Sequence, residues 1–530
     1  MKNYFKYIVV MALGIVSCEP EFDNPVDEKD AYTNGEADFS RYVALGNSLT
    51  AGYADNALYI TGQENAYPNI LAQQFEKTQD IEEFTIPFMS DNAGGLLLAG
   101  NQITQNRLVL AVDANGDPSP RVYTGMQPTT EVGNVLQGPF SNLGVPGAKS
   151  YHLGFSGYGN VQNLATQSAN PYFVRFASSP EATVLEDALA QNPTFFSLWI
   201  GNNDVLGYAT SGGTGETQTG MNPAEYGPDD ITNPIVFNTI YQQMVQALSA
   251  SSSGGVLINI PDVTSVPFFN TVPFNPLDPE DPDQADYAAQ IDLLNSTFAP
   301  LNQAFTFLSA EDRIVEFSKS DRSAVLVHDE SIPDLSAELT QVLIGGGLDQ
   351  ATATLYGMQF GQMRPANSED RILLTASSQI GGVNAERMQE LMEAGLDQAT
   401  AGRLSVNGIT YPLQDELALI PEELAIIENT VDAYNVIISQ VAQANGLAFI
   451  DANAMLNQLA NGGIPYDGGT ITSTFATGGA FSLDGIHLTP RGNAVIANEI
   501  ISTINETYNA DIPKVNPGSY ATVTASNEVQ

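Results

Sequence analysis

Five short apolar runs constrain the fold of this chain more than any other feature. They lie at residues 42–45, 140–143, 194–200, 256–260 and 447–450, and a Gly, Asn or Asp turn follows each one. Helical patterns lie between or after them, at residues 67–77, 234–249, 421–445 and 493–507. Strands that are apolar throughout and alternate with helices are typical of a parallel sheet covered on both faces. The sequence therefore predicts an α/β fold with three layers, α/β/α.

The connections between these strands are too long for a minimal α/β domain. About 90 residues separate the first two strands, and roughly 185 separate the last two. Segments 96–137, 208–231 and 262–284 are rich in Gly, Pro, Asn, Asp and Thr and are predicted as loops. We expect insertions at about 86–137 and 262–420, with short helices at 285–420 that form a cap or subdomain. GLDQATATL (347–355) and GLDQATAGRL (395–404) predict a duplicated helical hairpin.

The N-terminal segment predicts export and anchoring. Residues 1–17 combine Lys2 and Lys6 with an apolar run of about ten residues, which suits a signal peptide and is too short to span a bilayer. The segment ends at Ser17 and Cys18, the only cysteine in the chain, and resembles a bacterial lipobox. An ordinary signal peptide that happens to contain a cysteine is the alternative. We expect lipidation at Cys18 and export to the outer membrane, facing either the periplasm or the cell surface.

The rest of the chain divides into a tether, a body and a tail. Residues 18–38 are acidic and polar and predict a tether, a folded body is expected from near Phe39 to about residue 510, and residues 511–530 are expected as a C-terminal tail. No later segment is apolar for long enough to cross a membrane. The lipid anchor is therefore the only membrane attachment that we expect.

Charge and cysteine content exclude several classes of function. The chain has 18 Lys and Arg against 61 Asp and Glu, a net charge of −43, which repels phosphate backbones and excludes nucleic acid as a partner. One cysteine allows neither a disulfide framework nor a cysteine-based metal cluster. The oxygen-rich stretch 113–117 lacks the glycine and the final glutamate of a calcium loop, with Pro118 and Thr124 at those positions. A β-turn is therefore predicted there.

Four short segments, each after a predicted strand or near the C-terminus, carry residues suited to catalysis. They are GNSLTAGY with Ser48, NLGVPG with Gly147, GNND with Asn203, and DGIH with Asp484 and His487. A serine hydroxyl becomes a useful nucleophile when a neighbouring base accepts its proton. A histidine can both accept and return that proton near neutral pH.

The chain has only three histidines, so the choice of base is short. His152 follows the glycine segment, and His328 lies in VLVHDESIPD. We expect a structural or surface role for the first and a helix or strand edge for the second. Trp199, just before the asparagine segment, and Asn202, within it, are expected to pack against and support the site.

Together and in this order, the four segments resemble the SGNH, or GDSL, hydrolase family, from about residue 40 to 508. The resemblance implies a flavodoxin-like sheet of five parallel strands with large helical and loop insertions. It implies that Ser48 is the nucleophile, His487 the general base and acid, and Asp484 the group that orients His487. The backbone N–H groups of Ser48 and Gly147 and the side-chain amide of Asn203 would form the oxyanion hole. The family's usual aspartate before the nucleophile is Asn47 here, which leaves the local hydrogen bonding open.

The resemblance implies ester hydrolysis through an acyl-enzyme, without a metal or an organic cofactor. The substrate would be a small-molecule, glycan or lipid ester. A carbohydrate O-deacetylase is the alternative within enzymes. A surface lipoprotein that binds glycans or proteins and keeps a vestigial site is the alternative from another class.

The composition of the insertion at 262–420 bears on substrate size. The insertion mixes acidic and polar stretches and lacks the broad apolar patch that long-chain lipases use to bind a lipid surface. This composition favours esters with short acyl groups or polar esters as substrates. YPLQDELALIPEEL and LLLAG (96–100) are the opposing signal, since they suit an acyl groove.

Overall fold

The computed structural model describes residues 31–112 and 116–529. The signal peptide expected at 1–17, Cys18, and most of the tether expected at 18–38 lie outside the described residues. So do three residues of the β-turn predicted at 113–117.

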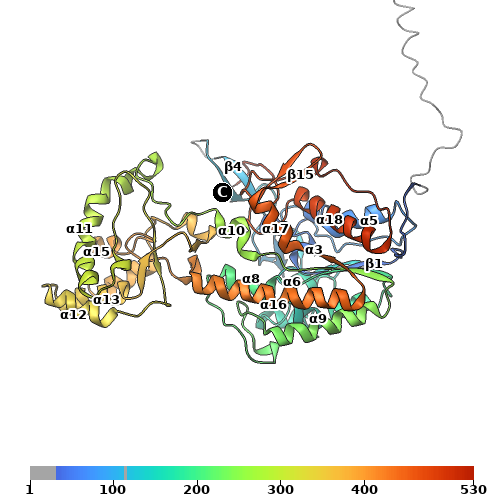
Figure 1. Ribbon diagram of the computed structural model, residues 1–530, viewed down its shortest axis with the longest axis horizontal. Coiled ribbons are helices and arrows are strands. Elements are labelled where there is room, and N and C mark those ends of the chain that lie inside the picture. Colours follow the sequence, from blue (N-terminus) through green and yellow to red (C-terminus); the bar gives the residue numbers. More distant parts are fainter. Residues whose placement is uncertain (1–30, 113–115, 530) are drawn as a thin grey trace, which may run out of the picture.

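A five-stranded, all-parallel sheet forms the centre of the α/β body, between its helices (Figure 1), as the sequence predicts. Its strand order is β14-β9-β8-β1-β7. The strands are β1 (Tyr42–Gly46), β7 (Asn142–Gly144), β8 (Phe195–Trp199), β9 (Gly254–Ile258) and β14 (Ala448–Ile450). In register, Leu45 of β1 pairs with Leu143 of β7 on one side and with Leu198 of β8 on the other.

Helices cover both faces of this sheet because its strands are apolar on both sides. Val43 and Leu45 pack in a core with α7 (Val184–Leu189), α9 (Pro234–Ser249) and α16 (Pro421–Asn445). Tyr42 and Ala44, which alternate with them, pack in a second core with α5 (Tyr67–Phe75) and α18 (Pro490–Tyr508). The result is an α/β fold in three layers, with α9 and α16 at their predicted bounds.

The first insertion contains short strands where loops are predicted. β2 (Leu96–Leu98), β3 (Asn101–Gln102) and β6 (Thr130–Glu131) form a small sheet, and β4 (Leu108–Val112) pairs with β5 (Pro118–Val122) as a hairpin. The prediction of loops across 96–137 is therefore wrong in part. Composition indicates where the chain turns, but strand pairing depends on segments up to about 35 residues apart in the chain.

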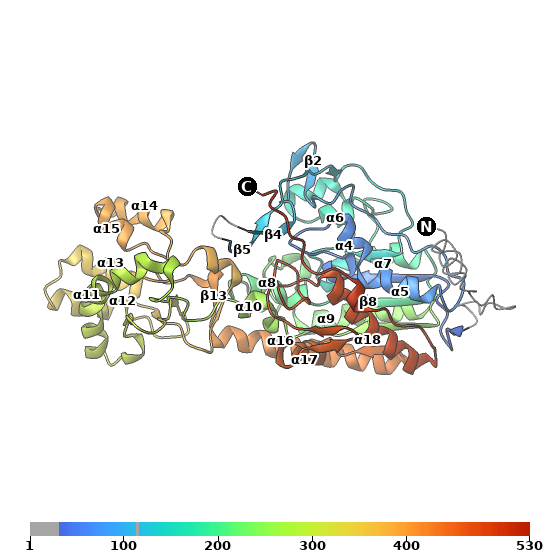
Figure 2. The same ribbon diagram turned by 90° about the horizontal axis from the view of Figure 1, so that it is seen from above.

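Residues 285–420 form a subdomain that extends from one end of the α/β body (Figure 2). Its helices are α11 (Ala285–Phe307), α12 (Ser336–Gly345), α13 (Gln350–Phe360), α14 (Ala385–Glu393) and α15 (Gln398–Arg403). Short paired strands, including β10 (Leu326–His328) with β11 (Met363–Pro365), complete it. Phe298, Leu301 and Phe305 of α11 belong to a hydrophobic core separate from those of the sheet. The 23 residues of α11 exceed the short helices expected there.

The two similar segments occupy equivalent places in two helical hairpins, α12–α13 and α14–α15, as predicted. Asp349 caps α13 and Asp397 caps α15, and each carboxylate accepts the N–H groups two and three residues later. Gly347 and Gly395, two residues before the caps, have φ of 101° and 103°. The repeated sequence thus encodes the same turn and the same helix start twice.

Both ends of the described chain pack closer to the body than predicted. Thr33 pairs with Asp511, and the N–H of Glu36 donates to the carbonyl of Tyr508, so ordered structure begins before Phe39. The segment expected as a tail folds back along the molecule, where the N–H of Ser526 donates to the carbonyl of Leu110. The polar side chains of these segments predict that the segments are exposed to solvent. They do not indicate whether the backbone forms hydrogen bonds with the body, so these contacts could not be predicted.

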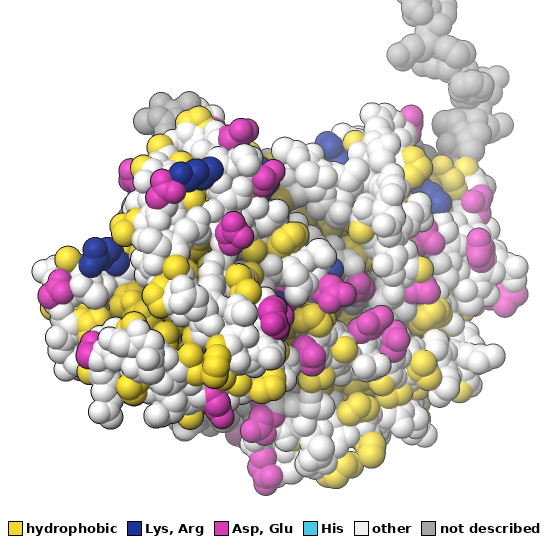
Figure 3. All heavy atoms as spheres, turned by 60° about the vertical axis from the view of Figure 1, so that its left-hand side comes forward, with side chains coloured by type: hydrophobic (Ala, Val, Ile, Leu, Met, Phe, Trp, Pro, Cys, Tyr) yellow, Lys and Arg dark blue, Asp and Glu magenta, His cyan; other side chains and the backbone are white. Residues whose placement is uncertain are grey.

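The negative net charge is visible on the surface. On the face drawn in Figure 3, Asp and Glu side chains outnumber those of Lys and Arg. Among the described residues, no helix combines the length and the apolar character needed to cross a membrane.

Candidate active site

Three of the predicted site segments meet at the carboxyl ends of neighbouring strands. Ser48 follows β1, Gly147 follows β7 and Asn203 follows β8, and β1 lies between the other two in the sheet. Parallel strands end at the same edge, which is where open α/β sheets form their crevices. The fourth segment, with Asp484 and His487, lies in the loop before α18.

Ser48 is the first residue of the short helix α3 (Ser48–Ala51), and it is 6% exposed. Asn47 caps this helix, with its side-chain oxygen accepting the N–H of Leu49 at 3.0 Å. The Asn47 amide also donates to Oδ1 of Asn202 at 3.1 Å. Both the oxygen and the amide group of the Asn47 side chain therefore have hydrogen-bond partners, and Asn47 links the GNSLTAGY segment to the GNND segment. This answers the question about local hydrogen bonding that the sequence left open.

A continuous line of hydrogen bonds joins Ser48, His487 and Asp484. Nε2 of His487 lies 2.9 Å from Oγ of Ser48, and its Nδ1 lies 3.0 Å from Oδ2 of Asp484. Oδ1 of the same carboxylate accepts the N–H groups of Ile486 and His487 at 2.9 and 2.8 Å. These bonds fix the carboxylate across one turn and leave its second oxygen facing the imidazole.

The electrostatics of Asp484 favour its ionised form. Burial alone would raise the pKa of this carboxyl, but the nearby His487 ring and hydrogen bonds from His487 and from the N–H of Asn56 hold the pKa well below its ordinary value. A carboxylate that stays ionised beside Nδ1 stabilises a positive charge on the imidazole. Tyr53 completes the surroundings, with its ring 4.8 Å from the His487 ring.

A small cavity of about 40 Å³ lies beside Ser48 and His487. Ser48, Asn203 and His487 line it, with apolar neighbours that include Leu49 and Ile486. Asn203 begins α8 (Asn203–Thr210) and uses Nδ2 to donate to the carbonyl of Ala148 at 2.9 Å, which leaves its second amide hydrogen for a ligand.

Gly147 is exposed and does not line this cavity, so the structure brings it less close than the resemblance implies. Its φ of 79° is in the left-handed region that glycine tolerates best. A Cβ there would meet only the Asn170 side chain, at 3.9 Å, so the space around Gly147 is open to a ligand.

Asp55 joins the loop after Ser48 to the loop that carries Asp484 and His487, and this role was not predicted from the sequence. Its Oδ1 accepts the N–H of Leu483 at 3.0 Å, its Oδ2 accepts the Tyr59 hydroxyl at 2.8 Å, and its own N–H donates to Oγ of Ser482. Burial raises the pKa of Asp55 to about 6, against the opposing effect of these hydrogen bonds. Ser482 and Leu483 lie 427 and 428 residues away in the chain, so no local pattern indicates this role.

Asp204 plays the corresponding part between the glycine and asparagine segments. Its fully buried carboxylate accepts the N–H of Ser150 at 2.7 Å and the hydroxyl of Ser150 at 2.6 Å. Burial raises its pKa, while the bonds from Ser150 and the charge of Lys149 oppose that shift. The sequence shows Asp204 as the last residue of the GNND segment. Nothing near it in the sequence indicates that Ser150 is its hydrogen-bond partner.

His152 has the structural role that the sequence predicts. Its Nδ1 accepts the N–H of Lys149 at 3.0 Å, and its ring stacks on Tyr158 at 4.6 Å. Burial, followed by the charge of Lys149, lowers the pKa of His152 to about 3. It remains neutral and makes no contact with Ser48.

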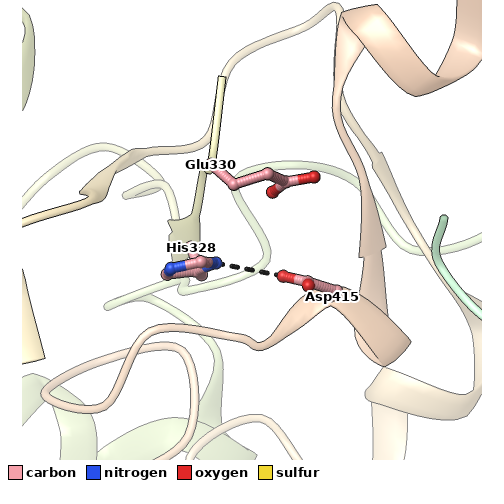
Figure 4. A group of neighbouring side chains, drawn as sticks. All are labelled: His328, Glu330 and Asp415. Carbon is pink, nitrogen blue, oxygen red and sulfur yellow. Dashed lines mark hydrogen bonds and ion pairs between the residues drawn. The ribbon is translucent and has the colours of Figure 1, made fainter. Parts of the chain in front are cut away.

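His328 lies at the edge of β10, as predicted, and forms an ion pair that was not predicted (Figure 4). Its Nδ1 lies 3.0 Å from Oδ1 of Asp415, and this hydrogen bond raises the pKa of His328. With Glu330, these are the only residues in the described part of the chain that cluster at a spacing suited to a metal ion. All three side chains are partly or fully exposed. The hydrogen bond between His328 and Asp415 explains why these two residues lie close together, without a metal ion.

No protein-family model, curated protein or solved structure matches this chain.

Proposed function

We propose that this protein is a serine ester hydrolase of the SGNH type, with the corresponding flavodoxin-like fold. The observation that carries the proposal is the hydrogen-bonded line from Ser48 through His487 to Asp484, which joins residues 439 positions apart in the chain. A hydroxyl, an imidazole and a carboxylate in this order are the parts that base-assisted nucleophilic catalysis needs.

The reaction begins with attack by Oγ of Ser48 on the ester carbonyl, while Nε2 of His487 accepts the hydroxyl proton. Asp484 remains ionised and stabilises the imidazolium that forms. His487 then donates the proton to the departing alkoxide, and the alcohol leaves an acyl group on Ser48. Water attacks this acyl-enzyme with His487 as the base, which releases the acid and restores the serine. No step requires a metal or an organic cofactor.

The charge that develops on the carbonyl oxygen needs donors fixed in advance. Ser48 and Asn203 line the cavity, so the N–H of Ser48 and the free amide hydrogen of Asn203 are two candidate donors, and the N–H of Gly147 is the third. A donor of this kind contributes about 3–4 kcal/mol to stabilisation of the transition state. The carbonyl of Ala148 supports this arrangement, since it fixes the orientation of the Asn203 amide.

We further propose that the protein is lipid-anchored at Cys18, outside the described residues, and acts at the outer membrane on small-molecule, glycan or lipid esters. The lipobox-like segment and the otherwise cysteine-free chain support this location.

Reaction with a fluorophosphonate probe tests the proposed chemistry. We expect one label per chain, on the peptide that contains Ser48, together with burst release of nitrophenol from p-nitrophenyl acetate. Ser48→Ala should lose both signals, and Ser156→Ala, at an exposed serine near the glycine segment, should keep them. A folded protein that takes no label, or is labelled at another residue, would contradict the proposal.

A further inference from the structure

A second cavity of about 90 Å³ lies against the site cavity. Every residue that lines it is apolar or glycine, and they come mainly from α17 (Ala452–Asn461), α18 and the loops near them. Met455 and Leu456 of α17 and Val495 and Ile496 of α18 are among the lining residues. The proposed reaction uses none of these four side chains.

The two cavities share part of their walls. Leu49, Pro261, Val266 and Ile486 line both of them. Leu49 follows the nucleophile directly in the chain, and Ile486 directly precedes His487. The apolar cavity therefore adjoins the space that contains Ser48 and His487. A chain attached to Ser48 would pass from one cavity to the other along these four shared side chains.

The lining determines what kind of ligand suits this space. An apolar cavity offers water few hydrogen-bond partners, and such cavities bind apolar molecules readily. Trp199, the one lining residue with an N–H in its side chain, already donates it to the carbonyl of Asn259 at 3.1 Å. A saturated hydrocarbon chain fits these surroundings, and a sugar or a charged group does not.

We propose that this cavity binds the acyl chain of the ester, and that the preferred substrates carry acyl groups of about four to six carbons. The proposal rests on the proposed function, because it takes Ser48 as the point of attachment. The acyl group stays bound to Ser48 until water releases it, whereas the alcohol must leave first. A recess beside the nucleophile therefore suits the acyl group, and the alcohol needs the open side.

The volume sets the upper limit on chain length. A cavity of about 150 Å³ accommodates one benzene ring, so about 90 Å³ leaves room for a few methylene groups beyond the carbonyl. Longer chains would have to leave the cavity or displace its walls. This limit agrees with the preference for short acyl groups predicted from the composition of the insertion.

A series of p-nitrophenyl esters with acyl chains of two to twelve carbons, kept below micellar concentrations, tests the proposal. Val495→Phe fills the cavity from a half-buried position, and Met455→Ala enlarges it. Met358→Ala is the matched control, because this methionine is 70% exposed on α13 of the subdomain. The measured quantity is the ratio of kcat/KM for hexanoate to kcat/KM for acetate.

We expect the wild-type ratio to exceed about ten, since a single methylene in an apolar pocket changes kcat/KM by tenfold or more. Val495→Phe should lower the ratio at least tenfold, Met455→Ala should move the optimum to longer chains, and Met358→Ala should change neither.

A wild-type ratio near one, or equal effects of Val495→Phe on both esters, would overturn the acyl site. A preference that follows the alcohol chain in a series of alkyl acetates would overturn its assignment to the acyl group. In each of these cases, acetate hydrolysis that disappears in Ser48→Ala would still support the proposed function. Acetate hydrolysis that persists in Ser48→Ala would overturn both.

Discussion

The backbone N–H of Asn56 donates a hydrogen bond of 2.9 Å to Oδ2 of Asp484, the same oxygen that faces Nδ1 of His487. The loop that follows Ser48 thus helps to orient the Asp484 carboxylate, which in turn contacts the His487 ring. Asp55, the preceding residue, bonds to Ser482 and Leu483 of the same distant loop. The positions of Ser48 and His487 relative to each other therefore depend on contacts between two loops, and not only on the sheet.

Ser48 and His487 should act as one unit. We expect Ser48→Ala and His487→Ala each to remove nearly all ester hydrolysis, and the double variant to be little worse than either, because each group is ineffective without the other. Steady-state kinetics on p-nitrophenyl acetate measure this. His152→Ala is the control and should stay active. A His487→Ala variant with a tenth of wild-type activity, beside an inactive His152→Ala, would show that the base is assigned wrongly.

Asp55→Ala should lower kcat more than it raises KM. Removing the carboxylate releases the N–H of Leu483 and the hydroxyl of Tyr59, which weakens the contact that positions Asp484 and His487. We expect a loss in kcat of about tenfold or more and a loss of about 1–3 kcal/mol in the free energy of unfolding. The kinetics should be measured well below the unfolding temperature. Asp55→Asn keeps an oxygen for Leu483 and should recover part of kcat; equal kcat in all three proteins would exclude a positioning role.

The sequence was sufficient to predict the sheet and much of the site. Continuous apolar runs located all five central strands, since burial on both faces leaves a local pattern in β1 and β8. The serine and histidine segments were singled out because four segments in a fixed order resemble one family; each segment alone is a weak signal. Asp55, Asp204 and the pairing of β2 with β6 were not predictable, because each depends on a partner chosen by the tertiary fold.

Stability should fall as the pH rises from about 5 to 8, in part through Glu423. This side chain caps the start of α16, with Oε2 accepting the N–H of Ile420 at 2.8 Å, and it is 5% exposed. Burial, and then the nearby carboxylates of Glu330 and Asp415, raise its pKa from 4.5 to about 8. A carboxyl whose pKa is raised by folding stabilises the folded state at pH values below its pKa in the unfolded chain. This contribution disappears as the pH rises past its pKa in the folded protein.

In the wild type, we expect Glu423 to account for about 2–3 kcal/mol of the fall in the free energy of unfolding between pH 5 and 8, after allowance for solvent screening. Glu423→Gln should remove this part of the pH dependence. Denaturant unfolding at several pH values measures the effect. Glu428→Gln, at an exposed position on the same helix, should leave the wild-type slope unchanged. Parallel slopes for the wild type and Glu423→Gln would contradict the ionisation assigned to this carboxyl.

Cys18→Ala should move the protein out of the membrane fraction, or leave its signal peptide uncleaved. Two or more acyl chains hold a protein stably at a membrane, whereas a single chain holds it only marginally. Fractionation of cells that make either form compares the two, and intact-mass measurement of the native protein identifies the acyl groups. An unmodified N-terminus on the mature protein would exclude the anchor.

Asn203 and Gly147 should differ in how much activity they control. Asn203→Ala removes the amide that lines the site cavity, and we expect kcat to fall by about 10²–10³ with little change in KM, because the donor acts mainly on the transition state. It also loses the bond to Ala148, at a cost of about 1 kcal/mol in stability.

Gly147→Ala keeps the backbone N–H at this position, and the added methyl group enters open space. Its effect should therefore be limited to about 1–2 kcal/mol of backbone strain at a φ of 79°. Kinetics and thermal unfolding of both variants separate the two effects; equal losses of kcat would show that Gly147 contributes to catalysis as much as Asn203 does.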